Sequence, residues 1–295
     1  MDPLDAPFEQ LDALEQGRAF AELSWFRRVR VTGADARGWL HDLITTDVDS
    51  LRTGQARRSL LLSPTGRIRA DFSLGSDADG FVLLQAAGQP EHVDDALAPY
   101  VLSSAVSLIE ADGDLSVFAV PGDAEVADVP DRLDPSVLGT GVDLLTPTGE
   151  SARRLLDALR DKGLVQVGSE ALEVWRVRHG RPRMGVDFDE GSLPAEAGLD
   201  ATIDATKGCF LGQESVAKVR NLGHPPRMLA HVRASRPIAV GSTVAADGAQ
   251  VGTVTSAVAD GPSGTVAIVR IRWEALMSRL MTGDGVPLIP IGSTD

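Results

Sequence analysis

The order of elements predicted between residues 29 and 100 limits the possible folds more than any other feature of this sequence. Alternating apolar and polar residues predict strands, and apolar residues spaced three and four apart predict helices. The predicted strands are 29–32, 60–62, 68–74 and 81–84, and the predicted helices are 36–43 and 93–100. Short strands joined by turns, with helices between and after them, are typical of an antiparallel sheet with helices on one face.

A second round of the same kind follows, and then the pattern changes. Residues 115–120 predict another strand, and several Pro, Gly and Asp residues predict a loop over 121–140. After Arg236 and Pro237 the sequence predicts only short strands separated by glycine turns, which is typical of a small β-barrel or sandwich. These strands are 240–244, 250–255 and 265–271. Because 295 residues are many for a single core, we expect an α+β fold of two or three lobes that ends in a small β-barrel.

Charge and composition exclude several classes of protein. The formal net charge of −14 repels phosphate backbones, so we expect no direct binding of nucleic acid. A single cysteine and five histidines without HxxxH spacing predict no intrinsic metal centre. The acidic first residues lack the apolar core of a signal peptide, and no apolar stretch approaches the roughly 20 residues of a membrane helix. We therefore expect a cytoplasmic protein that has no membrane partner.

The most informative stretch lies between residues 194 and 229. Lys207 and Cys209 are two residues apart, so on an extended segment their side chains point to the same face. A neighbouring ammonium stabilises a thiolate, which predicts a reactive Cys209. Gly208 and Gly212 have no side chains, so a flat ligand or another backbone can approach the thiol closely. The alternatives are a buried structural cysteine and glycines that serve only their turns.

Residues 207–214, KGCFLGQE, resemble the K-G-C-[YF]-x-G-Q-E signature of YgfZ-type folate-binding proteins in the glycine-cleavage T-protein superfamily. All seven specified positions of that signature are satisfied. Further segments resemble other motifs of the superfamily: 23–35 (LS…RVTGAD), 43–48 (LITTDV), 62–67 (LSPTGR) and 194–199 (PAEAGL). The resemblance covers most of residues 20–275, and the C-terminal barrel is its least distinctive part.

The resemblance implies a three-lobed ring, in which two α+β lobes and a small C-terminal β-barrel surround a central hole. Tetrahydrofolate, or a one-carbon derivative of it, would bind in that hole between the first two lobes and the barrel. On this basis residues 1–228 form a two-lobed α+β folate-binding core, and residues 229–295 form the barrel. Residues of about 49–112 are a candidate inserted lobe within the core.

The resemblance also implies which residues bind the folate. In T-proteins a glutamate of the P-x-E segment holds the pterin ring, and this position corresponds to Glu196. A pterin presents a 2-amino group and an N3–H side by side, and a carboxylate accepts both as a bidentate pair. Trp25, Arg220 and Gln213 are the other candidate folate-binding residues. A helix-start carboxylate or a surface charge is the alternative for Glu196, and core packing is the alternative for Trp25.

One departure from the T-protein pattern bears on catalysis. T-proteins carry a catalytic aspartate in an Asp-Asp pair, whereas the corresponding residues here are Ala70 and Asp71. Asp71 is a weak candidate for the catalytic acid, because adjacent residues of a strand face opposite sides. Cys209 and Lys207 are the candidates for a thiol function.

We therefore expect a tetrahydrofolate-binding accessory protein. Members of the resembled family support assembly or repair of iron–sulfur clusters in client enzymes, including radical enzymes that modify tRNA. A cluster needs about four ligands, so Cys209 would share one with a client protein or act as a thiol. The alternatives are a tetrahydrofolate-dependent aminomethyl or methyl transferase, and an interaction module that has lost folate binding.

Overall fold

The computed structural model describes residues 8–122, 131–261 and 264–292. The chain divides into two compact units. We call Pro7–Ser169 together with Ala201–Gln213 the sheet unit, and Glu170–Asp200 together with Glu214–Asp295 the barrel unit. Almost all of the KGCFLGQE segment therefore belongs to the unit that the first half of the chain forms.

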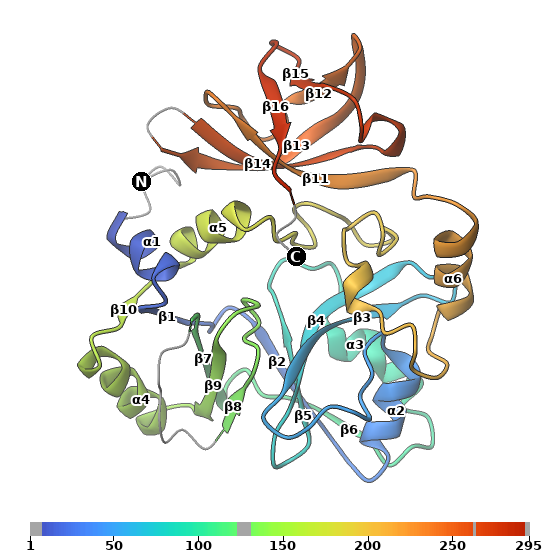
Figure 1. The fold of residues 1–295 in the computed structure, drawn as a ribbon. Helices are drawn as coiled ribbons and strands as arrows, with labels where there is room; N and C mark the ends of the chain where they lie inside the picture. The colour runs from blue at the N-terminus through green and yellow to red at the C-terminus, as the bar shows by residue number, and fades with distance from the viewer. Residues whose placement is uncertain (1–7, 123–130, 262–263, 293–295) are drawn as a thin grey trace. The chain divides into compact units, whose positions relative to one another are not determined.

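The first sheet of the sheet unit is antiparallel and has the strand order β3-β4-β5-β2-β6. Its strands are β2 (Arg27–Thr32), β3 (Ala56–Leu62), β4 (Ile68–Ser76), β5 (Phe81–Gln85) and β6 (Ser107–Glu110). The helices α2 (Ala36–Leu43) and α3 (Val93–Leu97) pack on one face of it (Figure 1), where Leu40 and Ala96 share a core with Phe72. The predicted antiparallel sheet with helices on one face is confirmed.

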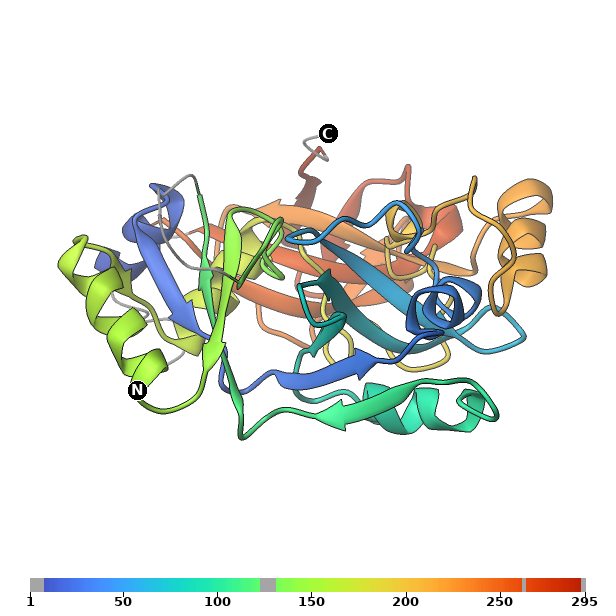
Figure 2. The same cartoon turned by 90° about the horizontal axis from the view of Figure 1, so that it is seen from below.

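The second sheet of this unit has the order β10-β1-β7-β9-β8. Its strands are β1 (Ala19–Glu22), β7 (Leu115–Val120), β8 (Asp131–Leu133), β9 (Val142–Pro147) and β10 (Val165–Gln166). Helix α4 (Glu150–Asp161) covers it (Figures 1 and 2) by packing Leu155 and Leu159 against Phe118. β8 lies inside the predicted loop 121–140, of which residues 123–130 lie outside the described residues. That prediction is wrong for β8, because three residues held by main-chain pairing with β9 leave no hydrophobic pattern in the sequence.

The barrel unit contains a closed barrel of six strands in the order β11-β14-β13-β12-β15-β16. The strands are β11 (Arg227–Ala234), β12 (Thr243–Ala246), β13 (Ala249–Asp260), β14 (Gly264–Arg272), β15 (Leu280–Thr282) and β16 (Pro287–Pro290). Pairing of Val232 with Pro290 closes the barrel, and Val232, Val244 and Val269 lie in its core. The predicted mixed α+β fold with a small C-terminal β-barrel is confirmed.

Short helices complete both units. They are α1 (Phe8–Glu15), α5 (Ser169–Arg178), α6 (Gln213–Leu222) and the 3-10 helices η1 (Ala98–Tyr100), η2 (Asp200–Thr202) and η3 (Trp273–Ala275). Within the described residues, no helix has the length and apolar character that a membrane crossing requires.

Candidate functional site

The lysine of the KGCFLGQE segment caps helix α2. The ammonium of Lys207 donates to the carbonyl oxygens of Ile44 at 2.6 Å and Thr46 at 3.0 Å, and also to that of His41. The last carbonyls of a helix lack partners within the helix, and the helix dipole favours a cation at this end. Lys207 therefore fixes its own segment to the LITTDV motif, which begins at the last residue of α2.

Lys207 is buried, and this burial determines its electrostatics. Burial lowers the pKa of the Lys207 ammonium to about 8, against the attraction of Asp47, Asp42 and Asp204. At neutral pH the amine keeps its proton, and each of its three N–H groups has a carbonyl acceptor. The backbone N–H of Asp204 adds a bond to the carbonyl of Thr45 at 3.0 Å, so the chain before Lys207 is held at the same place.

Gly212 brings the other end of the segment against the LSPTGR turn. Its φ of +85° lies in the left-handed region. A Cβ at this position would lie 2.5 Å from the carbonyl oxygen of Ser63 and 3.0 Å from the Cα of Gly66. Glycine is therefore required at position 212, both by the backbone conformation and by the close approach of the Ser63 and Gly66 backbone. Three motifs that are far apart in the sequence, LITTDV, LSPTGR and KGCFLGQE, thus meet within the sheet unit.

Cys209 is exposed, whereas Lys207 two residues earlier is buried. The prediction that both side chains share one face is wrong, because the chain bends at Lys207 and this segment is not an extended strand. The ammonium is bound by the carbonyls at the end of α2 and lies 5.4 Å from the ring centroid of the buried Phe210. The alternative of a buried structural cysteine is wrong as well, since the thiol faces solvent.

A histidine that no sequence motif indicates lies beside this segment. A Cβ on Gly208 would lie 3.8 Å from Nε2 of His41. On the other side of the ring, Nδ1 of His41 lies 3.3 Å from the carboxylate of Asp47 and 3.6 Å from that of Asp49. An imidazole with two carboxylate neighbours therefore lies next to the residue that precedes Cys209. Only the packing of α2 against the segment reveals it.

Asp71 forms a two-pronged ion pair with Arg58. Nε of Arg58 donates to Oδ1 at 2.8 Å, and Nη2 donates to Oδ2 at 2.6 Å. Ala70 belongs to the core beneath α2 and α3, so the two neighbouring side chains face opposite sides of β4, as adjacent strand residues do. The acid that remains of the T-protein pair is buried and neutralised by a fixed guanidinium.

Trp25 lines a hollow of about 300 Å³ in the sheet unit. It lies between β1 and β2, is half-buried, and packs against Phe26 with ring centroids 4.5 Å apart. Gln89 lines the same hollow and connects it to β4, because its Nε2 donates to the carbonyl of Asp71 at 2.6 Å and its Oε1 accepts from the N–H of Asp71 at 3.0 Å. Gln89 therefore borders the hollow that Trp25 lines and is bonded to the backbone of Asp71.

Glu196 belongs to the barrel unit and is buried. Its Oε2 accepts the backbone N–H of Leu193 at 2.9 Å, and its own N–H donates to the carbonyl of Leu193 at 3.0 Å. This reciprocal pair holds the carboxylate in one orientation. Each carboxylate oxygen has two lone pairs, so both oxygens of Glu196 can still accept from a ligand.

The remaining candidates lie at the two ends of α6. Gln213 is the first residue of the helix, and its N–H donates to the carbonyl of Phe210 at 3.2 Å. Arg220 is exposed in the last turn. Burial raises the pKa of Asp200, and the charge of Arg220 opposes this increase.

The candidate residues are divided between the two units. Lys207, Cys209 and Gln213 share one segment of the sheet unit, while Glu196 and Arg220 belong to the barrel unit. In the part of the chain that the structure describes, no three His, Cys, Asp or Glu side chains form a group that could hold a metal ion.

Comparisons with known proteins find a matching family domain, similar sequences and a similar solved structure. The sequence profile of the GCVT N-terminal domain matches residues 8–127. A putative chloroplast transferase of Arabidopsis thaliana is 26% identical over 285 residues, which cover 87% of this chain and 65% of the relative. The tRNA-modifying protein YgfZ of Colwellia psychrerythraea is 26% identical over 227 residues, which cover 70% of this chain and 69% of that protein. An aminomethyltransferase of a Nostoc species is 27% identical over 281 residues, which cover 83% of this chain and 74% of that enzyme.

One solved structure shares the fold along almost the whole chain. The crystal structure of glycine cleavage system aminomethyltransferase T from Bartonella henselae superposes with a TM-score of 0.78. The superposition covers 98% of this chain and 89% of that chain, at 22% sequence identity. The mixed α+β architecture with a C-terminal barrel is therefore that of the aminomethyltransferase fold.

Proposed function

The chain belongs to the glycine-cleavage T-protein superfamily as a YgfZ-type protein, and from this premise we propose that it binds tetrahydrofolate and supports iron–sulfur cluster assembly or repair in client enzymes. The observation that carries the proposal is the fixed, solvent-facing thiol segment. Lys207 and Gly212 hold both ends of this segment, and Cys209 between them is exposed. A segment so positioned can present its thiol to a second protein.

The geometry of Glu196 supports the folate part of the proposal. The bond from Leu193 fixes the carboxylate before any ligand arrives, so binding does not have to order it. A carboxylate with free lone pairs on both oxygens matches the adjacent 2-amino and N3–H donors of a pterin. Within the sheet unit, the half-buried Trp25 lines a hollow, and we propose it as a separate aromatic candidate for folate binding.

The ion pair at Asp71 favours the accessory role over a transferase. A general base must be free to take a proton, whereas both oxygens of Asp71 accept hydrogen bonds from the guanidinium of Arg58. The neighbouring position is Ala70, which has no acid at all. The names of the relatives include both transferases and a tRNA-modifying protein, so activity has to be measured on this chain.

The cluster part of the proposal requires a partner protein. One cysteine supplies a single thiolate, whereas a cluster takes about four ligands. We therefore propose that Cys209 acts on a cluster held by a client, including clients that modify tRNA, and that the client supplies the other ligands.

Three measurements test the proposal. Titration with tetrahydrofolate, followed by tryptophan fluorescence, should show saturable binding. If no binding is observed, the remaining hypothesis is an interaction module that has lost folate binding. A methylene-transfer assay with an aminomethylated carrier protein should show no ammonia release, whereas turnover of about 1 per second or faster would establish the transferase. Loss of the chain from cells should lower the cluster content of tRNA-modifying radical enzymes, and unchanged content would refute the accessory role.

A further inference from the structure

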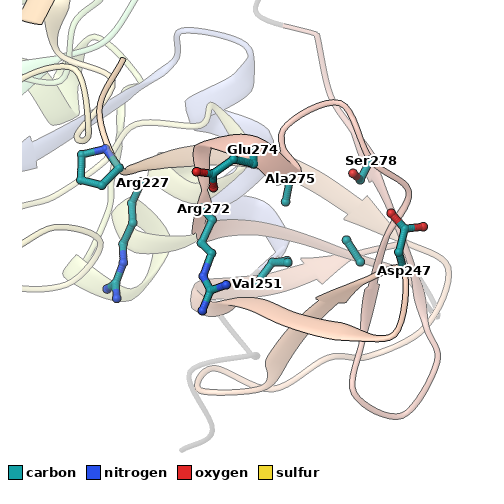
Figure 3. Close-up of a pocket in the computed structure, with 9 residues that line it drawn as sticks. Arg227, Asp247, Val251, Arg272, Glu274, Ala275 and Ser278 are labelled. Carbon is teal, nitrogen blue, oxygen red and sulfur yellow. The ribbon is translucent and has the colours of Figure 1, made fainter. Parts of the chain in front are cut away.

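Two arginines lie directly opposite each other on the outside of the barrel. Arg227 begins β11 and Arg272 ends β14, and the two residues are register partners in this antiparallel pair. Both are exposed. Figure 3 shows their side chains extending in the same direction, with the guanidinium groups at the same end.

Neither arginine of this pair has a counterion among the residues that the structure describes. Among the described residues, neither guanidinium makes a hydrogen bond or an ion pair, although Glu274 is near in sequence. Figure 3 places the carboxylate of Glu274 at the opposite end of the arginine side chains from the guanidinium groups. Like charges directly opposite across two strands destabilise a sheet. In a chain with a net charge of −14, two uncompensated cations at one place need a physical reason.

The pair borders a hollow large enough for a small molecule. The hollow has a volume of about 620 Å³ and lies entirely within the barrel unit. Its lining combines apolar side chains, among them Pro226, Val251 and Ala275, with the two arginines. The carboxylates of Asp247 and Glu274 also line it, and Figure 3 shows both of them away from the guanidinium groups. A volume of this size is typical of ligand sites, and it exceeds what a lone inorganic anion fills.

We propose that this hollow binds a small molecule through an oxyanion group, a phosphate or a carboxylate, held between Arg227 and Arg272. A guanidinium presents paired N–H donors in a plane, and two such groups can hold the oxygens of one oxyanion from two sides. Binding also removes the repulsion between the two cations, which adds to the free energy of binding. The negative charge of the rest of the chain disfavours a long polyanion such as nucleic acid, so the ligand is a small molecule.

The test is calorimetric titration of the intact chain with inorganic phosphate and, separately, with citrate, at constant ionic strength. The proteins compared are the wild type, the double variant Arg227→Gln/Arg272→Gln, and Arg236→Gln. Arg236 is an exposed arginine of the same unit that is not among the lining residues, so it controls for loss of surface charge. Circular dichroism checks that the exposed substitutions leave each barrel folded.

Saturable binding that the double variant weakens at least about 10-fold, and that Arg236→Gln retains, supports the site. Binding of phosphate alone identifies a phosphorylated ligand, binding of citrate alone identifies a carboxylate, and binding of both identifies a general oxyanion site. The proposal is overturned by a wild type that binds neither anion below about 10 mM, or by three proteins that bind equally well.

Discussion

The ammonium of Lys207 lies 2.6 Å from the carbonyl oxygen of Ile44, so the lysine of the KGCFLGQE segment caps a helix instead of facing Cys209. Two residues of this segment, Lys207 and Cys209, therefore have different roles. Lys207 orders the segment from inside the sheet unit, and Cys209 is the chemical group that it exposes. Lys207 is therefore a positioning residue in the proposed function.

Replacing Lys207 with Met should lower the free energy of unfolding by about 1.5–3 kcal/mol. The change removes the donors that satisfy the carbonyls of Ile44, Thr46 and His41, and buried acceptors without partners destabilise the folded state. Urea unfolding measures this loss. The control is Lys218→Met, which removes an exposed lysine of α6 and should change stability by less than about 0.5 kcal/mol. Equal effects of both variants would contradict the capping role.

Replacing Gly212 with Ala should destabilise the sheet unit by more than about 2 kcal/mol. Alanine at a φ of +85° is strained, and its Cβ would lie 2.5 Å from the carbonyl oxygen of Ser63, which is backbone and cannot move freely. Gly208→Ala is the matched control within the same motif, because its Cβ would meet only Nε2 of His41 at 3.8 Å. Thermal unfolding of the two variants should therefore differ clearly. Similar melting temperatures would show that the LSPTGR turn yields to the added methyl group.

Several strands and helices of this fold were predictable because their buried faces impose a periodic pattern of apolar residues on the sequence. The alternation at Val29 and Val31 and the helical spacing of Trp39, Leu40 and Leu43 were sufficient to predict β2 and α2. The β8 strand was not predictable, because main-chain bonds to β9 hold it and such bonds are independent of side-chain pattern.

The sequence motifs of the candidate site were predictable, whereas the orientations and contacts of its side chains were not. Resemblance selected Lys207 and Cys209, but the geometry of an extended strand gave them the wrong relative orientation, since the chain bends at Lys207. The acceptors of Lys207 are backbone carbonyls, which every residue carries, so no residue type in the sequence indicates them. The carboxylate of Asp71 could equally have been free, and only the register of β3 and β4 places Arg58 beside it.

Replacing Glu196 with Gln should weaken tetrahydrofolate binding by about 1–3 kcal/mol. The amide oxygen can still accept the N–H of Leu193, so the local fold should persist. The amide NH₂ would then meet a pterin donor, and a charge-assisted pair becomes a neutral one with one mismatch. Fluorescence titration measures the change, and Glu190→Gln, at an exposed acid of the same unit, should bind as the wild type does. Unchanged affinity in Glu196→Gln would remove Glu196 from the site.

Asp143 should make the stability of the chain fall as the pH rises toward 7. Burial raises the pKa of Asp143 to about 7, although Ser136 donates to it at 2.5 Å and the N–H of Val137 at 2.7 Å. The unfolded carboxyl titrates near 3.9, so the folded state alone holds this proton between about pH 4 and 7. The stabilisation is complete below about pH 4 and is lost as the pH rises through 7.

Asp143→Asn removes that titration, so its unfolding free energy should decline less than that of the wild type between pH 5 and pH 8, by about 2 kcal/mol. Urea unfolding across this range measures the difference. Asp157→Asn, at an exposed acid on α4, should follow the wild-type curve. Parallel curves for Asp143→Asn and the wild type would show that the buried carboxyl does not titrate in this range.

Cys209 should react with iodoacetamide in the folded protein, without denaturant, because its side chain faces solvent. Lys218→Met, which removes an exposed lysine of α6, is the control and should label at the wild-type rate. Because the Lys207 ammonium is bound by carbonyls, a changed labelling rate in Lys207→Met would report movement of the segment and not loss of thiolate stabilisation.

Cys209→Ser should fold and bind tetrahydrofolate as the wild type does, since an exposed thiol contributes little to packing. The same variant should fail to restore cluster-dependent tRNA modification in cells that lack the protein, because the hydroxyl cannot replace the thiolate as nucleophile or ligand. Labelling that requires denaturant, together with full complementation by Cys209→Ser, would show that the thiol has no part in the function.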